Sequence, residues 1–253
     1  MRIPRIYCPV PLNIGSRIDL PPTALNRVVR VLRLKAGATL ILFNGAAGEF
    51  HGVLATVTRS TATVNIQAYS PREAESPLPV LLAQGISRGE RMDYTLQKAV
   101  ELGVSVILPV LTERSVVKLE QERWRHRIQH WQGIIVGACE QCGRNRLPLL
   151  LEPVSLTKCL QSSALQGLKL VLDPLAPSTL SLLAPPPPPP PPAVSLLIGP
   201  EGGLSPAEIA MAAAAGFTAV RLGPRVLRTE TAALVALTAV QLRWGDLGLI
   251  PPS

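Results

Sequence analysis

Two glycine loops in the C-terminal third of the chain have the composition expected of a ligand-binding site. The first is Gly199-Pro200-Glu201-Gly202-Gly203, and the second begins at Gly223-Pro224. Each follows a short apolar run, Val194–Ile198 or Phe217–Leu222, that is typical of a buried strand. Glycine lets the backbone approach a ligand closely, and Gly-Pro ends a strand. Ordinary strand-to-helix turns share this composition, so both interpretations stay open here.

A helix with strong end signals connects the two loops. Ser205-Pro206-Ala207-Glu208 is a capping box with proline at the first helical position, and Gly216 is a typical helix stop. Strand, glycine loop and helix therefore occur twice in succession, which predicts a parallel α/β sheet with a ligand site at the carboxyl ends of its strands. The chain lacks a GxGxxG fingerprint in these loops, which disfavours a Rossmann-type oxidoreductase.

The preceding residues show the same alternation of strands and helices. The predicted strands are Val80–Ile86, Val104–Leu108 and Leu168–Leu172, and the predicted helices are Arg91–Leu102, Gln121–Ala138 and Thr231–Leu242. Thr231–Leu242 is apolar nearly all round, so we expect it to be buried against its own sheet or against a partner subunit.

The N-terminal part has a different pattern. We predict a helix from Pro21 to about Leu34, ended by Gly37, and then strands at Thr39–Phe43, Phe50–Thr58 and Ala62–Ala68. Asn44-Gly45 is a strong hairpin signal between the first two of these strands. Residues 1–70 are therefore predicted to form a small, mostly β module, a barrel of a kind that often binds RNA.

The distribution of charge supports a polyanion-binding role for this module. The formal net charge is +8, and residues 1–72 carry nine Arg or Lys against the two acids Asp19 and Glu49. Arg27, Arg30 and Arg33 are spaced three apart and give the predicted helix a basic face. Such a face binds nucleic acid or is merely solvated.

Other features limit the possible classes of function. The chain has four cysteines, and Cys139-Glu140-Gln141-Cys142 is formally C-x-x-C, but no second pair or histidine set follows it, so we expect no metal site. No apolar run reaches the length of a membrane span, and the N-terminus lacks a signal core, so we expect a cytoplasmic protein without a membrane partner. The eight prolines at 185–192 are expected to form polyproline II, as an inserted surface loop or, alternatively, as a ligand for an SH3-type domain.

At this point the chain resembles a known family, the RsmE-type methyltransferases of the SPOUT superfamily. The most specific motifs are Ile198-Gly-Pro-Glu-Gly-Gly203 and Leu222-Gly-Pro-Arg-Val-Leu-Arg-Thr-Glu-Thr-Ala232. Gln97-Lys-Ala-Val-Glu-Leu-Gly103, Glu113-Arg-Ser115 and Glu140-Gln-Cys-Gly-Arg144 support them. The resemblance covers essentially the whole chain. It implies an enzyme that uses S-adenosylmethionine to methylate N3 of one uridine in 16S (small-subunit) ribosomal RNA.

The resemblance also implies an architecture. It predicts a PUA-like RNA-binding β-barrel at residues 1–72, a linker at 73–79, and at 80–253 an α/β SPOUT domain with a parallel sheet and a trefoil knot. It further implies a homodimer in which the last helix packs on the partner, and a substrate that is the 16S rRNA or the small ribosomal subunit.

Site residues follow from the same resemblance. The methyl donor is expected to be gripped by loops after Leu172, Ile198 and Leu222. The predicted donor-binding residues are Leu172, Gly199, Pro200, Glu201, Gly202, Leu222, Gly223, Leu227, Arg228 and Thr231. The predicted RNA-binding residues are Arg2, Arg5, Arg27, Arg30, Arg33, Arg88 and Arg114.

Two of the residues are assigned catalytic roles as hypotheses. A guanidinium at Arg228 would stabilise charge on uracil O2 or O4, and Glu230 would accept the N3 proton, directly or through water. Glu230 would alternatively only bond to backbone at the start of the last helix. Two other functions stay open, namely a SPOUT enzyme with another RNA target, such as a ribose 2′-O-methyltransferase, and a non-enzymatic RNA-binding ribosome-assembly factor.

Overall fold

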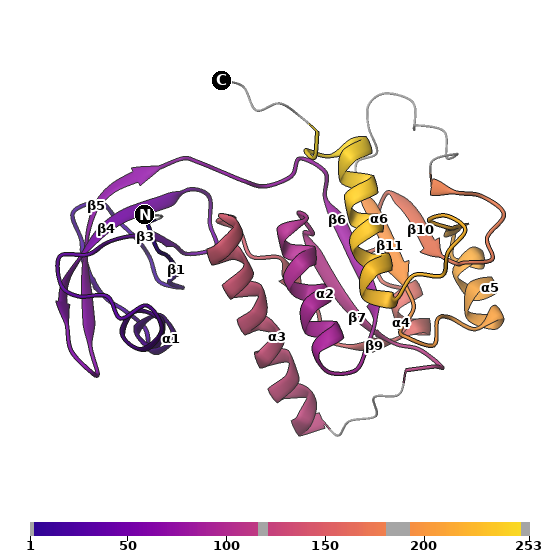
Figure 1. Ribbon diagram of the computed structural model, residues 1–253, viewed down its shortest axis with the longest axis horizontal. Coiled ribbons are helices and arrows are strands. Elements are labelled where there is room, and N and C mark those ends of the chain that lie inside the picture. Colours follow the sequence, from indigo (N-terminus) through magenta and orange to yellow (C-terminus); the bar gives the residue numbers. More distant parts are fainter. Residues whose placement is uncertain (1–2, 116–120, 181–192, 249–253) are drawn as a thin grey trace. The chain divides into compact units, whose positions relative to one another are not determined.

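The computed structural model describes residues 3–115, 121–180 and 193–248 (Figure 1). The chain divides into two compact units, which are described separately. The first unit comprises Met1–Glu75 with Val136–Leu147, and the second comprises Ser76–Ile135 with Pro148–Ser253. The first unit thus includes a segment from the middle of the chain, which the sequence pattern did not indicate. Arg2 and the polyproline run lie outside the described residues.

The first unit is built on a five-stranded sheet with the order β1-β3-β4-β5-β2. Its strands are β1 (Arg5–Tyr7), β2 (Arg17–Asp19), β3 (Thr39–Phe43), β4 (Glu49–Val57) and β5 (Ala62–Ser70). β1 runs parallel to β3, and the other pairs are antiparallel. Alternate residues of β3 and β5, such as Leu40, Leu42, Val64 and Ile66, are buried in one apolar core. The predicted mostly β module is therefore present.

The basic helix of this unit is shorter than predicted. It consists of α1 (Pro22–Asn26) followed by a π-helical turn, η1 (Arg27–Val31). The helix ends at Leu32 rather than at Gly37, because Arg33 adopts a left-handed backbone with φ of 52°. A non-glycine residue in this region stores strain and is uncommon.

The second unit contains a seven-stranded sheet in which every pairing is parallel, as the sequence predicts. The order is β12-β10-β11-β6-β7-β8, with β9 also paired to β7. The strands are β6 (Val80–Gly85), β7 (Val106–Leu111), β8 (Leu149–Leu150), β9 (Val154–Ser155), β10 (Leu168–Leu172), β11 (Val194–Ile198) and β12 (Thr218–Val220). All five residues of the central strand β11 are buried, which agrees with its largely apolar sequence; its one polar side chain, Ser195, is hydrogen-bonded to the backbone of Gln166.

Helices cover both faces of this sheet. The helices are α2 (Glu90–Glu101), α3 (Gln121–Cys142), α4 (Leu156–Leu160), α5 (Pro206–Ala214) and α6 (Thr229–Trp244). α2 and α6 pack side by side against β6 and β11 (Figure 1), whereas α4 and α5 share a core with the opposite face. The last helix buries Ala233, Ala236, Leu237 and Val240. Its apolar Val235 and Leu242 remain exposed, by 39% and 61%.

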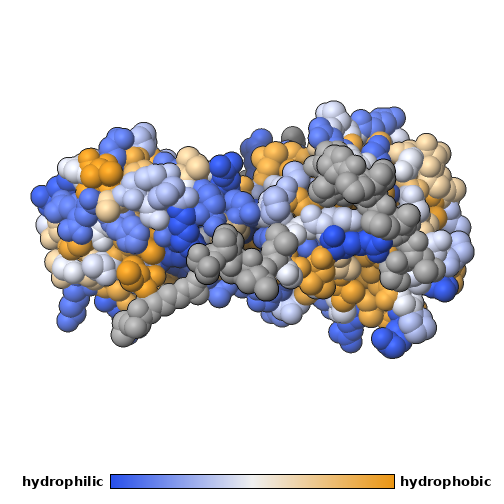
Figure 2. Space-filling model, turned by 90° about the horizontal axis from the view of Figure 1, so that it is seen from above, coloured by the Kyte–Doolittle hydropathy of each residue, from blue (hydrophilic) through white to orange (hydrophobic). Residues whose placement is uncertain are grey.

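The helix ends confirm the signals read in the sequence. Ser205 Oγ accepts a hydrogen bond from Glu208 N, and the Glu208 side chain accepts one from Ser205 N, so the capping box is complete. Gly216 has a φ of 85°, which permits the turn after α5. None of the helices in the described part of the chain is both long and apolar enough for a membrane crossing. Hydrophilic and hydrophobic residues are interspersed on the face drawn in Figure 2.

Candidate functional site

Three adjacent strands of the second unit end at one cavity. β12, β10 and β11 are neighbours in the parallel sheet, so the loops after Leu172, Ile198 and Val220 leave from the same edge. Together these loops line a cavity of about 320 Å³, called here the glycine-loop cavity. Its wall includes residues 172–175, 198–204, 220–223 and 225–227. This is the position at which open α/β sheets bind ligands.

Close backbone packing explains two glycines at this edge. A Cβ atom at Gly199 would lie 2.8 Å from the backbone of Gly203 and Leu204. A Cβ atom at Gly85, the last residue of β6, would lie 2.5 Å from the nitrogen of Pro200. Since real Cβ atoms do not approach backbone so closely, glycine at 199 is required for the loop to fold back on itself, and glycine at 85 for the loop to lie against β6.

A buried hydrogen-bond chain fixes the first glycine loop to the start of α6. Gln84 Nε2 donates to Thr229 Oγ1 at 2.9 Å, and Thr229 Oγ1 donates to the Gly199 carbonyl at 2.6 Å. Gln84 is fully buried and Thr229 is 6% exposed. Both hydrogen bonds therefore lie away from water, and breaking either would leave a buried polar group without a partner. The chain holds a loop of the cavity in one position.

Glu201 connects the same loop to the start of α2. Its Oε1 accepts hydrogen bonds from the Arg88 backbone N–H at 2.9 Å and from Arg91 Nη1 at 3.0 Å. Burial alone would raise the pKa of the Glu201 carboxyl, but these bonds and the charge of Arg91 outweigh it and hold the pKa below its ordinary value. The carboxylate therefore stays ionised and acts as a clamp between loop and helix.

Arg114 closes another side of the glycine-loop cavity. Its Nη1 donates to the Gly202 carbonyl at 2.8 Å, and the residue itself lines the cavity. The neighbouring Glu113 N–H donates to Glu208 Oε1 at 2.8 Å, so the capping carboxylate of α5 also positions the segment that carries Arg114. The sequence predicted Arg114 as an RNA contact, but in the structure its guanidinium is bonded to the glycine loop.

Two apolar side chains that line this cavity are exposed to solvent. Leu175 is 89% exposed and Val226 is 81% exposed, and both belong to the lining residues. Exposed aliphatic side chains at a concave site are suited to cover the apolar surface of a ligand.

A second cavity lies beside the first. It has a volume of about 800 Å³ and is lined from α2, from α3 and from the first turn of α6. Arg91, which pairs with Glu201 of the glycine-loop cavity, lies in the wall of the second cavity. The two cavities therefore share a wall.

The first turn of α6 also separates the two cavities. Thr229 and Ala232 line the glycine-loop cavity, whereas Arg228, Glu230 and Thr231 line the second cavity. Eight of the ten predicted donor-binding residues lie in the glycine-loop cavity, namely Leu172, Gly199, Pro200, Glu201, Gly202, Leu222, Gly223 and Leu227. The other two, Arg228 and Thr231, are placed in the second cavity instead, because the helical turn directs successive residues to different sides.

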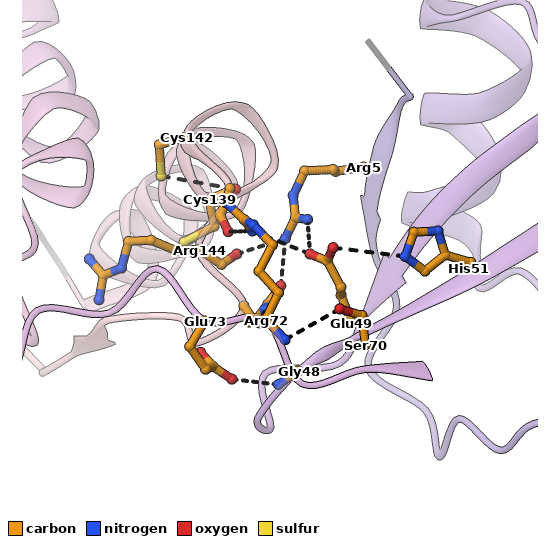
Figure 3. Close-up of polar contacts among 12 residues, drawn as sticks. Arg5, Gly48, Glu49, His51, Ser70, Arg72, Glu73, Cys139, Cys142 and Arg144 are labelled. Atoms are coloured by element: carbon orange, nitrogen blue, oxygen red, sulfur yellow. Dashed lines mark hydrogen bonds and ion pairs between the residues drawn. The ribbon is translucent and has the colours of Figure 1, made fainter. Parts of the chain in front are cut away.

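Arg5 corrects the list of predicted RNA contacts. Its side chain is buried, with the whole residue 7% exposed, and its guanidinium donates to Glu49 (Figure 3). It also donates to Asn145 Oδ1 at 2.5 Å. Arg72 Nη1 reaches the same Glu49 carboxylate at 3.4 Å. Arg5 is therefore a structural residue of the first unit, because its guanidinium forms a buried ion pair with Glu49.

The end of α3 belongs to the same polar cluster. Arg144 Nη2 donates to Glu75 Oε2 at 2.6 Å, and Asn145 Nδ2 donates to the Arg72 carbonyl at 2.5 Å. Glu75 lies in the segment predicted as a linker. These contacts explain why Val136–Leu147 is part of the first unit.

The remaining predicted RNA contacts differ in exposure. Arg30, Arg33 and Arg88 are exposed. Arg27 is partly exposed, and its Nε lies 2.8 Å from Glu140 Oε2. Burial raises the pKa of the Glu140 carboxyl, although the Tyr7 N–H and the charges of Arg27 and Arg5 oppose that rise. Arg27 therefore balances a buried acid as well as contributing to the basic face.

The C-x-x-C segment lies in the last turn of α3. Burial raises the pKa of the Cys139 thiol to about 12, and Cys142 is partly buried. Across residues 3–115, 121–180 and 193–248, no group of three or more His, Cys, Asp or Glu side chains is placed to hold a metal ion.

Sequence reasoning missed Gln84, Thr229 and the second cavity. One signal for Gln84 was available, because a glutamine at the end of the apolar run Val80–Ala83 is a buried polar residue that must find partners. Thr229 belongs to the motif Leu222–Ala232, but the sequence assigned no role to its hydroxyl. Of the residues of α2 and α3 in the second cavity, Gln97 begins a motif quoted above, but no role was predicted for any of them.

The fold and the site together define a class of protein. A parallel α/β sheet with glycine loops around a cavity is joined to a small basic β unit, a combination suited to a nucleic-acid-modifying enzyme. Residues 74–241 match the model of the RNA methyltransferase domain, and residues 28–67 match that of the RNA methyltransferase PUA domain. The chain belongs to this family of RNA methyltransferases, which confirms the α/β fold class and the PUA-like N-terminal part.

Relatives and solved structures agree with this assignment. The chain is 36% identical to the ribosomal RNA small subunit methyltransferase E of Buchnera aphidicola subsp. Schizaphis graminum, over 97% of this chain and 98% of the relative. It is 38% identical to the enzyme of the same name from Neisseria gonorrhoeae, solved with bound S-adenosyl methionine (TM-score 0.87; 97% and 99% of the two chains). A Legionella pneumophila protein assigned as a methyltransferase and solved with SAM is 43% identical (TM-score 0.92; 97% and 100%).

Proposed function

We propose that this protein transfers a methyl group from S-adenosylmethionine to N3 of a uridine in small-subunit ribosomal RNA. The observation that carries the proposal is the convergence of the loops after β10, β11 and β12 on one cavity, in a chain that shares the family of the two SAM-bound structures. The named relatives supply the choice of the small-subunit RNA, and the choice of N3 rests on the resemblance to the RsmE-type enzymes.

The residues of the glycine-loop cavity fit this donor. Backbone groups of Leu172, Gly199 and Leu222 would hold the adenine, and the exposed Leu175 and Val226 would cover its apolar surface. The absence of a side chain at Gly199 lets the loop fold back on Gly203 and Leu204 at the edge of the cavity. When bound, S-adenosylmethionine supplies a methyl group on a sulfonium, which is already a strong electrophile.

Arg228 and Glu230 act on the RNA rather than on the donor in this proposal. Both line the second cavity, on the other side of the first turn of α6. Uridine N3 carries a proton at neutral pH, so the enzyme must accept that proton while the base is held in line with the methyl group. Glu230 accepts the proton, and Arg228 stabilises negative charge on uracil O2 or O4.

The proposal includes the assembly and the substrate. The exposed Arg30, Arg33 and Arg88 contact RNA phosphates. A homodimer forms through α6, whose exposed Val235 and Leu242 need an apolar partner. The target base is unpaired or flipped out, because N3 lies on the pairing edge. The small ribosomal subunit as substrate implies that the protein works in the cytoplasm.

The test is a methylation assay with a defined product. Purified protein is incubated with labelled S-adenosylmethionine and small ribosomal subunits from a strain that lacks the modification, and digested RNA is analysed by mass spectrometry. We expect N3-methyluridine at one position. A 2′-O-methylated nucleotide would refute the choice of N3. A folded protein that neither methylates nor binds S-adenosylhomocysteine would instead be a non-enzymatic RNA-binding factor.

A further inference from the structure

The first half of α3 carries a local excess of positive charge to which the proposed function gives no role. Residues 121–131 contain three arginines and two histidines against a single acid, Glu122. Residues 73–253 as a whole carry sixteen Arg or Lys against fifteen acids, so the excess is local rather than a property of the whole C-terminal part. A concentration of positive side chains on one element is typical of a polyanion-binding surface.

The helical period places these side chains on two different sides of α3. Arg123, His126 and Arg127 are three and four residues apart and lie on one side, called here the α3 basic face. Arg125 is two residues from either arginine and therefore lies on another side. Arg123 and His126 are exposed and Arg127 is partly exposed, whereas Trp131 of the same helix is fully buried. The α3 basic face is consequently open to solvent.

The two arginines of this face are available to an external anion. Among the side chains that the structure describes, neither Arg123 nor Arg127 has an ion-pair partner. The guanidinium carbon of Arg127 lies 5.6 Å from the centroid of the Trp131 ring, and that ring packs against Trp124 with 6.3 Å between centroids. A guanidinium held against a fixed ring keeps its planar fork in one orientation, which suits a forked contact with a phosphate.

The α3 basic face borders the wall of the second cavity. His130, three residues after Arg127, lines that cavity, and its Nε2 forms a 2.8 Å hydrogen bond with Asp93 Oδ2 of α2. This half of α3 therefore lies beside α2, within the second unit (Figure 1). Arg228 belongs to the same cavity wall. A strand of RNA held along α3 would thus lead towards the residue proposed to act on RNA.

We propose that the α3 basic face binds the phosphate backbone of the substrate RNA. Arg123 and Arg127 are one turn apart, about 6 Å along the helix axis, so each reaches a different phosphate of one strand. Such contacts position the RNA without reading its sequence. The identity of the RNA rests on the proposed function, whereas the binding of a polyanion rests on the arginines themselves. RNA is favoured over an acidic protein surface because the chain belongs to a family of RNA methyltransferases.

The experiment measures how RNA binding depends on salt. The Kd for small ribosomal subunits that lack the modification is measured between about 0.05 and 0.2 M salt. The unchanged protein is compared with Arg123→Gln, Arg123→Gln/Arg127→Gln, Arg127→Lys and Arg125→Gln. Arg125→Gln is the matched control, because it removes the same charge from an exposed position on another side of the same helix. Far-UV circular dichroism and titration with S-adenosylhomocysteine check that each variant is folded with its donor cavity intact.

Each variant has its own expected result. Each phosphate contact contributes about 0.7–0.9 to the slope of log K against log salt concentration, so the double variant should flatten that slope by about 1.4–1.8. The same contacts predict binding about 10- to 30-fold weaker at about 0.15 M salt. Arg123→Gln alone should show about half of the change in slope. Arg127→Lys keeps the charge, and both it and Arg125→Gln should retain the slope to within about 0.3.

The outcomes separate this proposal from the one on which it rests. If the double variant keeps the slope of the unchanged protein, or if Arg125→Gln flattens it as much, the α3 assignment is overturned even in a protein that methylates its uridine. If the slope falls as expected in a protein that methylates no uridine, the proposed function fails and the α3 basic face remains a polyanion-binding surface. An unchanged slope with weaker self-association would assign the face to a protein contact, which also overturns the proposal.

Discussion

Replacing Thr229 by valine tests whether the buried hydrogen-bond chain positions the donor loop. Valine has nearly the same shape as threonine but lacks the hydroxyl. That hydroxyl accepts from Gln84 Nε2 at 2.9 Å and donates to the Gly199 carbonyl at 2.6 Å. The substitution therefore leaves one N–H and one carbonyl buried without a partner, and it changes little else.

The magnitude follows from the burial of these groups. Gln84 is fully buried, and Gly199 lies in the buried first turn of the loop. Each orphaned buried group costs about 1–3 kcal/mol, so Thr229→Val, which orphans two of them, should lower the free energy of unfolding by about 2–6 kcal/mol. Thr229→Ser is the matched control. It keeps the hydroxyl and loses one methyl group, at about 1 kcal/mol.

Urea denaturation and calorimetry measure the two consequences. The unfolding free energy is compared for both variants, and the Kd for S-adenosylhomocysteine is measured at a temperature where each is folded. Because the Gly199 carbonyl belongs to the donor loop, we expect Thr229→Val to raise that Kd about tenfold or more. A Gln84→Leu and Thr229→Val double variant should lose about 1 kcal/mol less than the sum of the single losses.

One result would refute the reasoning. If Thr229→Val unfolds within about 0.5 kcal/mol of Thr229→Ser and binds the donor equally well, the chain does not position the loop. A loss of stability without a change in donor Kd would limit the chain to a structural role.

Four further substitutions or conditions test the rest of the site. Gly199→Ala brings a Cβ within 2.8 Å of loop backbone, so unfolding free energy should fall by about 1–3 kcal/mol in urea titrations, with weaker donor binding. Arg114→Ala removes a 2.8 Å bond to the glycine loop and should raise the donor Kd about fivefold by calorimetry; weaker RNA binding with an unchanged donor Kd would favour the predicted RNA role instead. Arg5→Ala leaves the buried Glu49 with the longer contacts to Arg72 at 3.4 Å and to His51 at 4.0 Å, which should cost about 3–5 kcal/mol of unfolding free energy. The pKa of Glu201 lies below its ordinary value, so its clamp is complete above 4.5 and is lost as the pH falls through the lowered pKa; donor affinity should decline there, and not in Glu201→Gln.

The position of the glycine-loop cavity could be predicted from the sequence because its determinants are local. Val194–Ile198 and Thr218–Val220 are strands in the structure, and a glycine loop follows each of them. Parallel pairing then brings their carboxyl ends to one edge without further information. The capping box at Ser205 and Glu208 likewise involves residues three apart, so its presence in the sequence sufficed.

The burial of Arg5 and the backbone conformation of Arg33 could not be predicted in this way. Arg5 resembled the other basic residues of the first unit, and its burial depends on Glu49, 44 positions away, and on Asn145, 140 positions away. Spacing within one helix indicated a continuous basic face at Arg33, whereas the left-handed backbone at that residue ends the helix early. Long-range pairing and local backbone strain leave no periodic signal in a single sequence.

The first turn of α6 divides its residues between the two cavities. Thr229 and Ala232 are three residues apart and therefore lie on one side of the helix, the side of the glycine-loop cavity. Glu230 and Thr231 line the second cavity together with Arg228, which precedes the helix as its N-cap residue with extended backbone. A substitution on either side should consequently change the affinity for one ligand and leave the other intact. The motif that runs from Leu222 to Ala232 thus contains two interleaved sets of residues, one lining each cavity.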